Sequence, residues 1–192
     1  MSDKYHHGDL RNALIEEGIK MINTSGEASL SMRKIAEKCG VSMAAPYAHF
    51  KNKEEMVNSI KQYVEESFTC YLENALKKTS DDIEKKIIAL GIAYISFFIE
   101  NPEYFTFLFS RGYIHVNLDF KSTDANNFKP FQILKDLCSI YFNEKKPEFS
   151  DYEKELDIIR IWASVQGLTS IIFMQNVKWS RNWEEEISKL LK

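Results

Sequence analysis

The sequence predicts an all-α protein of about nine helices. Apolar residues recur at helical spacing along most of the 192-residue chain, and no segment shows a convincing strand-like period of two. The chain holds only seven Gly and four Pro. Since tight turns depend on these residues, their scarcity favours long helices over a turn-rich β fold.

Composition limits the classes of protein that fit. A chain of this length can bury a sizeable core without covalent or metal cross-links. Cys39, Cys70 and Cys138 form no C-x-x-C pair, so we expect no disulfide framework, no metal and no other cofactor. The polar N-terminus argues against a signal peptide, and the uncharged run 161–177 is short and holds several polar residues. We interpret that run as a buried helix and expect a cytoplasmic protein with no membrane contact.

The N-terminal third is predicted to form four helices. Residues 9–24 place Leu10, Leu14, Ile15, Ile19 and Ile22 on one face, and Gly26 suits a left-handed C-cap. Ser31 can cap a helix over 32–39, Gly40 allows a tight turn, and a short helix follows over about 43–50. Asn52, with Glu55 three residues later, predicts a capping box that opens a helix over about 53–78.

The remaining segments continue the helical pattern. Ser80-Asp81-Asp82 begins a helix that ends at Glu100-Asn101, and Pro102 suits the first turn of a short helix to about 109. A polar loop is expected over 111–126. Helices are expected over about 127–143, 150–176 and 181–191.

Residues 31–50 have the spacing of a DNA-binding helix-turn-helix. Residues 29–53 hold five Lys or Arg and one Glu, a local charge of +4, which leaves −7 on the rest of a chain of net charge −3. Arg33 and Lys34 lie in a first helical turn, where cations oppose the helix dipole and a bound phosphate would relieve that conflict. The alternative is an ordinary solvated face with a mildly unfavourable charge pattern.

Three groups within residues 5–60 carry a family resemblance: Gly40-Val41-Ser42, Tyr47-x-His49-Phe50 and Lys51-Asn52-Lys53. This stretch resembles the N-terminal domain of TetR/AcrR transcriptional regulators. The resemblance implies a homodimer that binds double-stranded DNA at a palindromic operator. It also implies a DNA-binding domain over 1–53 and an effector-binding and dimerisation domain over 54–192.

By position, the resemblance implies DNA contacts at Arg33, Met43, Ala44, Ala45, Tyr47, Ala48, His49 and Lys53. Tyr47 and Lys53 would hold phosphates, whereas residues 43–45 would face base edges. Small apolar side chains can touch thymine methyl groups but make no bidentate hydrogen bonds. Much of the specificity is therefore expected from Arg33, water and DNA shape. Tyr47 as a core aromatic and His49 as a packing residue stay open as alternatives.

The body of the resembling family houses an effector pocket, here expected to bind a small apolar or aromatic molecule. The candidate lining residues are Phe68, Tyr71, Tyr94, Phe97, Phe98, Tyr104, Phe107, Phe131, Trp162 and Gln166. For each aromatic residue the alternative is a packed core. The run from Trp162 to Gly167 is similar to a Trp-x-x-x-His-Gly signature of one subgroup, but Gln166 replaces the titratable His with a neutral amide.

A dimer face is expected on the last two helices. Ala163, Gly167 and Ser170 follow one another at spacings that form a stripe of small residues, which allows another helix to approach closely. Met174, Trp183, Ile187 and Leu190 complete the predicted face. Two helices from each protomer would form a four-helix bundle. The alternative is packing within one chain only.

The predicted function is a homodimeric repressor that a small-molecule effector releases from its operator. An activator of the same fold and an interaction scaffold that has lost DNA binding are the alternatives. No G-x-G-x-x-G, G-x-x-x-x-G-K-[ST], H-E-x-x-H or G-x-S-x-G motif occurs, so we expect no enzyme activity.

Overall fold

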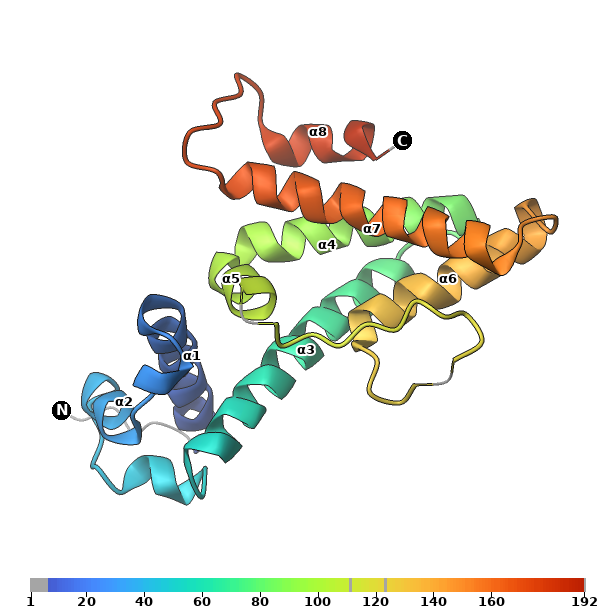
Figure 1. The fold of residues 1–192 in the computed structure, drawn as a ribbon. Helices are drawn as coiled ribbons and strands as arrows, with labels where there is room; N and C mark the ends of the chain where they lie inside the picture. The colour runs from blue at the N-terminus through green and yellow to red at the C-terminus, as the bar shows by residue number, and fades with distance from the viewer. Residues whose placement is uncertain (1–6, 111, 123, 192) are drawn as a thin grey trace. The chain divides into compact units, whose positions relative to one another are not determined.

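The computed structural model describes residues 7–110, 112–122 and 124–191, and within these ranges it contains eight α-helices, two 3-10 helices and no strand (Figure 1). The all-α prediction is confirmed. The chain divides into two compact units. The first unit comprises Met1–Glu66 and Glu103–Tyr113, and the second comprises Ser67–Pro102 and Ile114–Lys192. The predicted boundary after residue 53 separates a DNA-binding domain from an effector-binding and dimerisation domain. The division into compact units does not test this division of function, which stays a prediction.

The first unit begins with α1 (His7–Ser25), the 3-10 helix η1 (Glu27–Ser29) and α2 (Met32–Lys38). The predicted apolar face of α1 lies in the core, since Leu14, Ile15, Ile19 and Ile22 are fully buried. Gly26 follows α1 with a φ of 84°, which favours glycine, but its ψ of 163° is not helical. The predicted left-handed helical cap is therefore wrong in this detail.

The segment 43–50 differs from its prediction. It forms the 3-10 helix η2 (Ala45–Ala48) in place of a short α-helix, which accounts for eight α-helices in the described ranges against the nine predicted. Pro46 has no N–H for the i→i−4 bond of an α-helix. The Ala45 N–H instead bonds to the Ser42 carbonyl three residues earlier, at 3.0 Å. The preceding turn is as predicted, with Gly40 at a φ of 67°.

The first unit is completed by the beginning of α3 (Lys53–Lys77) and by α5 (Pro102–Ser110). Asn52 caps α3 as predicted, since its Oδ1 accepts from the Glu55 N–H at 2.8 Å. A capping box would have the Glu55 carboxylate accept from the Asn52 N–H. It accepts instead from the N–H of the preceding residue, Lys51. A Cβ at Gly18 of α1 would lie 2.7 Å from Ile60 Cδ1, so glycine permits the close approach of α1 and α3.

The second unit is built around α4 (Ile83–Glu100), which contacts α6 (Lys129–Lys145), α7 (Asp151–Phe173) and α8 (Trp183–Leu190). Asp82 caps α4 by accepting from the Lys85 N–H at 3.0 Å. Ser150 opens α7 with a complete capping box to Glu153. Phe68 of α3 is fully buried and lies 4.7 Å, centroid to centroid, from two aromatic rings of α4.

Helix α7 is mostly exposed within one chain. Only Ile158, Val165 and Thr169 of this helix are buried, and 17% of its most apolar 18-residue window lies inside the protein. The expectation of a buried helix over 161–177 is therefore wrong for a single protomer. By length and composition alone, α7 is the one helix in the described ranges that could cross a membrane.

Candidate nucleic-acid interface and ligand pocket

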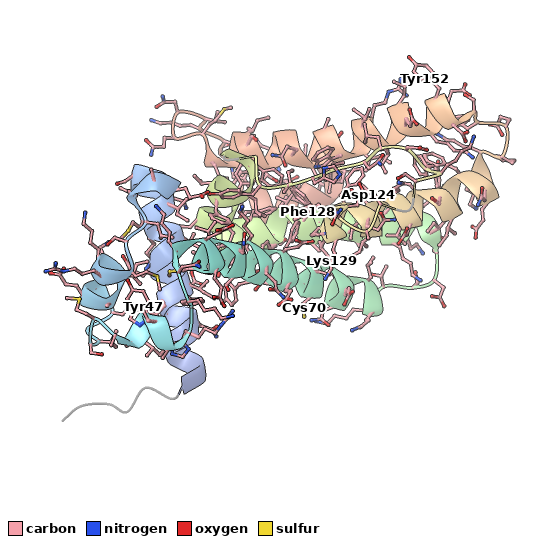
Figure 2. All side chains as sticks on the ribbon, turned by 60° about the horizontal axis from the view of Figure 1, so that its bottom comes forward. Tyr47, Cys70, Asp124, Phe128, Lys129 and Tyr152 are labelled. Atoms are coloured by element: carbon pink, nitrogen blue, oxygen red, sulfur yellow. The ribbon has the colours of Figure 1, made fainter. Side chains whose placement is uncertain are left out.

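The predicted DNA-contacting side chains of the first unit lie largely on its surface. Tyr47, labelled in Figure 2, lies on η2. Its side chain is 58% exposed, and that of Met43 is 47% exposed. Arg33, Ala44 and Ala48 are also exposed, whereas Ala45, His49 and Lys53 are half-buried. The exposure of Tyr47 excludes a fully buried core position. The His49 ring instead contacts the buried Phe50 ring at 6.2 Å, so packing and DNA contact both stay open for it.

The cations of the predicted interface differ in how they are paired. Lys38 pairs with Glu17 at 2.5 Å, and the Lys53 ammonium donates to the Ala28 carbonyl at 2.8 Å. Among the described residues, Arg33 and Lys34 form no ion pair. These two cations lie in the first turn of α2, where Ser31 Oγ accepts from the Lys34 N–H at 3.4 Å. The first turn of α2 therefore carries two exposed positive charges without an ion-pair partner among the described residues.

A cavity of about 310 Å³ lies within the second unit. Its walls come from α4, α6, α7, the end of α3 and the C-terminal residues Leu190 and Leu191. None of the described residues that line it carries a charged side chain. Its polar side chains are Tyr94, Trp162 and Ser164. The cavity therefore offers a mainly apolar surface with few hydrogen-bonding groups, which is typical of small-molecule sites.

Tyr94 links two walls of this cavity. Its hydroxyl donates to Gln166 Oε1 of α7. Burial raises the pKa of the Tyr94 hydroxyl well above its ordinary value, and a hydrogen bond with Trp162 opposes that rise only in part. The hydroxyl therefore stays protonated and neutral at physiological pH.

Comparisons with known proteins identify the first of these regions. A family model described as bacterial regulatory proteins of the tetR family matches residues 14–60. This segment is a TetR-family domain. It contains η1, α2, η2 and the first turns of α3, and most of α1. The exposed face of α2 and η2 thus belongs to the TetR-family domain.

A curated relative matches a longer stretch of the chain. The nucleoid occlusion factor SlmA of Alteromonas mediterranea is 29% identical over 82 residues, which is 43% of this chain and 42% of that protein. The chain thus matches less than half the length of this relative.

Solved structures share the fold over almost the whole chain. The TetR family transcriptional regulator PfmR from Thermus thermophilus has a TM-score of 0.61 at 21% identity, with 93% of this chain and 91% of that chain covered. AibR, solved in complex with isovaleryl coenzyme A and operator DNA, has a TM-score of 0.62 at 16% identity, with 94% of each chain covered. At these identities the likeness establishes the fold alone. Outside the TetR-family domain, the second unit therefore shares an architecture with these regulators.

The predicted pocket residues separate into four groups. Tyr94, Phe131 and Trp162 line the cavity, and Gln166 lies behind Tyr94 as its hydrogen-bond partner. Phe68, Phe97 and Phe98 form a buried aromatic cluster. Tyr71 donates to Glu100 at 2.7 Å; burial, followed by this bond, raises its pKa to about 12.

The last two predicted pocket residues lie in the first unit. Tyr104 donates to Glu16, and the Phe107 ring lies 4.7 Å from the Tyr113 ring. Both belong to α5, which the sequence pattern assigned to the body. The structure does not bring them to the cavity of the second unit.

Most of the cavity wall is aliphatic and lies outside the predicted, mainly aromatic set. The missed residues are Leu72, Ile87, Ile88, Leu90, Gly91, Phe128, Pro130, Leu134, Ile161, Ser164, Val165, Leu190 and Leu191. The apolar character of α4 around most of its circumference was an available signal, because such a helix is buried on several sides. A Cβ at Gly91 would lie 3.0 Å from Leu191 Cδ1, so this glycine leaves room in the cavity wall.

The predicted dimer-face residues are also divided. Ala163 and Met174 are exposed, Gly167 and Ser170 are half-buried, and a Cβ at Gly167 would meet no described atom within 4 Å. Ile187 is only 1% exposed, so it packs within its own chain. The remaining two lie on α8, where Trp183 contacts Trp179 at 4.4 Å and Leu190 borders the cavity while 46% exposed.

Proposed function

We propose that this protein is a sequence-specific DNA-binding transcriptional regulator that acts as a homodimeric repressor at a palindromic operator. A small-molecule effector in the second unit releases it from DNA. It works in the cytoplasm and has no enzyme activity. The TetR-family domain supports DNA binding, and AibR supplies a structure of this fold with both a small ligand and operator DNA.

The observation that carries this proposal is the exposed face at α2 and η2. Arg33 is exposed, and Tyr47 presents an aromatic ring and a hydroxyl to solvent. Arg33 can reach base edges or phosphates, whereas Tyr47 can donate to a phosphate oxygen. The 3-10 segment that carries Tyr47, together with its N-cap, presents Ala44, Ala45 and Ala48, which limits direct base reading to apolar contacts. Specificity then depends on Arg33 and on DNA shape.

The exposed stripe of α7 supports the homodimer. Ile159, Ala163, Gly167 and Ile171 lie at intervals of four residues, so they share one helix face, and Met174 follows directly after the helix ends. Ile159, Ile171 and Met174 are 39%, 37% and 53% exposed, and Gly167 faces open space. An apolar stripe with small residues at its centre fits a second helix closely. A second protomer that packs here would bury surface that one chain leaves exposed.

The proposed release requires the effector to bind the two states of the dimer differently. A ligand with equal affinity for the DNA-bound and DNA-free states would shift nothing. The two DNA-binding domains of the dimer would need to present their recognition segments to successive major grooves, about 34–36 Å apart. The effector would favour a different spacing.

Selection of duplexes from a random DNA pool by the purified protein, at a fixed salt concentration, tests the function. We expect an enriched palindrome whose half-sites are separated by about one helical turn. Failure to enrich any sequence, with folded and dimeric protein that has been unfolded and refolded to remove bound ligand, would contradict the proposal.

Variants then test the assigned face on the selected operator. Arg33→Ala and Tyr47→Ala are each expected to weaken binding by about 1–3 kcal/mol, which is roughly 5- to 150-fold. Lys38→Ala is the matched control, because its charge is already paired with Glu17, and it should change binding little. Equal losses for Arg33→Ala and Lys38→Ala would mean that only general charge matters and that the assignment is wrong.

A further inference from the structure

The cavity of the second unit has no partner for an ionic ligand among the described residues. Its lining contains no Lys, Arg, His, Asp or Glu. A charge moved from water into such surroundings without a partner loses several kcal/mol of hydration. The site therefore discriminates strongly against ligands that would place a carboxylate or phosphate inside it.

A buried cation lies next to the cavity wall but is already bound. Lys135 follows the lining residue Leu134 on α6 and is only 3% exposed. Its ammonium donates to the main-chain carbonyl of Asp119 and, at 3.4 Å, to that of Asn117. It also lies 5.8 Å from the centre of the Phe120 ring. Lys135 therefore holds the loop before α6 and is not free to neutralise a ligand.

The polar groups of the cavity are largely satisfied within the protein. The Tyr94 hydroxyl donates to Gln166, and Ser164 Oγ donates to the Arg160 carbonyl at 2.8 Å. The Tyr94 oxygen already takes part in a hydrogen bond with Trp162, whereas the Ser164 oxygen keeps acceptor lone pairs. A ligand can thus gain a weak hydrogen bond here, for example by donating a hydroxyl proton, but the described lining offers it no cation that would stabilise an anion.

Size sets a further limit. A volume of about 310 Å³ corresponds to roughly ten water molecules at about 30 Å³ each. A ligand of about ten non-hydrogen atoms fits such a space. A coenzyme A group is several times larger and carries phosphates, so it would have to remain outside the cavity.

From this lining, the engaged Lys135 and this volume, we propose that the cavity binds an uncharged, mainly apolar molecule of about ten non-hydrogen atoms. A medium-chain alcohol or a similar neutral compound has this chemistry. Any effect of this ligand on transcription depends on the proposed regulatory function, but the binding itself does not.

The test compares three ligands with one eight-carbon chain and different head groups: octan-1-ol, octanoate and octanoyl coenzyme A. Each is titrated into the full chain, without DNA, by calorimetry. Octan-1-ol is expected to bind at least tenfold more tightly than octanoate and octanoyl coenzyme A. Any other order, or no binding of octan-1-ol up to its solubility limit, would overturn the proposal.

Two further measurements locate the site and its size. Ile161→Trp fills the cavity from α7 and should weaken octan-1-ol at least tenfold, whereas Ile140→Trp, exposed on α6 and outside the lining, should not. If Ile161→Trp does not fold, the wild-type series from hexan-1-ol to dodecan-1-ol decides the matter. Affinity should rise and then level once the cavity is full; a rise of constant increment through dodecan-1-ol contradicts a cavity of this volume.

These results separate the two proposals. An enriched operator without octan-1-ol binding would support the proposed regulator and contradict the proposed ligand class. Octan-1-ol binding without an enriched operator would support the proposed ligand class and contradict the proposed regulator.

Discussion

At the scale of single residues, Tyr94 is the polar link between α4 and α7. Its hydroxyl bonds to Gln166 and interacts with Trp162, and all three residues are on or next to the cavity wall. Water does not replace a hydrogen bond that is lost in apolar surroundings. Gln166 and Trp162 therefore depend on the Tyr94 hydroxyl for this hydrogen bond. The neutral amide of Gln166, which stands where the similar signature has His, accepts the hydrogen bond of Tyr94 and brings no charge of its own.

Tyr94→Phe is expected to reduce the free energy of unfolding by about 1–3 kcal/mol, since it leaves the Gln166 carbonyl oxygen without its donor. Tyr71→Phe is the matched control, because its hydroxyl bonds to an exposed Glu100 that water can solvate instead. The loss there should stay below about 1 kcal/mol. Urea unfolding of the two variants compares them, and equal losses would contradict the role given to Tyr94.

At the scale of elements, α7 has two faces with different roles. Its buried face, with Ile158, Val165 and Thr169, packs in the second unit. Its opposite face carries the exposed apolar stripe. This division explains why a long apolar helix is so little buried in one chain.

Ala163→Glu places a charge in the middle of the exposed stripe and should shift the protein from dimer to monomer at micromolar concentration. Removing a carboxylate from water in a helix–helix contact is costly, whereas the same residue on a free surface is not. Ile140→Glu on α6 is the control, since Ile140 is 47% exposed and lies outside the stripe. Sedimentation velocity measures the result; a wild type that is monomeric, or an Ala163→Glu variant that stays dimeric, would rule out this face.

The junction of α6 and α7 contains an ion-pair network around Asp157. Its carboxylate lies 2.9 Å from both Lys146 Nζ and Arg160 Nη1. Burial alone would raise the pKa of Asp157, but the hydrogen bonds from Lys146 and Arg160 outweigh it and hold the pKa below the ordinary 3.8. The network therefore stabilises the charged carboxylate of the folded state.

Because the pKa of Asp157 is lower in the folded than in the unfolded state, its ionised carboxylate adds to the free energy of unfolding. This contribution is complete above the unfolded-state pKa and is lost as pH falls through the folded-state pKa. Asp157→Asn should therefore lower the urea midpoint at pH 7, and the difference from wild type should shrink below about pH 4. Urea unfolding at several pH values measures this. A difference that does not change with pH would exclude the charge as its source.

At the scale of the whole molecule, the proposed regulator couples two binding events. If a ligand lowers operator affinity by some factor, the operator must lower ligand affinity by the same factor. We expect calorimetry on the free protein and on its operator complex to give this equality. A ligand that releases DNA yet binds both forms equally well would show that release occurs by direct competition at the DNA-binding face or through the DNA itself.

The sequence by itself determined the features that depend on neighbouring residues. The caps at Ser31, Asn52 and Asp82, the turn at Gly40 and the apolar face of α1 are local patterns, since their hydrogen bonds or side-chain spacings span only a few residues. The TetR-family segment is equally local, because the turn and its two flanking helical segments are contiguous in the chain. The 3-10 form of η2 has a local cause as well, because Pro46 lacks the N–H that an α-helix would need there.

Only the tertiary structure decided which residues meet across long separations. It placed α5, with Tyr104 and Phe107, in the first unit, and it built the cavity from aliphatic residues of segments up to 119 positions apart, from Leu72 to Leu191. Helical periodicity reports which face of a helix is apolar, but not which other apolar face covers it. Aromatic side chains were therefore a poor guide to the cavity, because the largest of them fill the core while smaller residues such as Gly91 leave space.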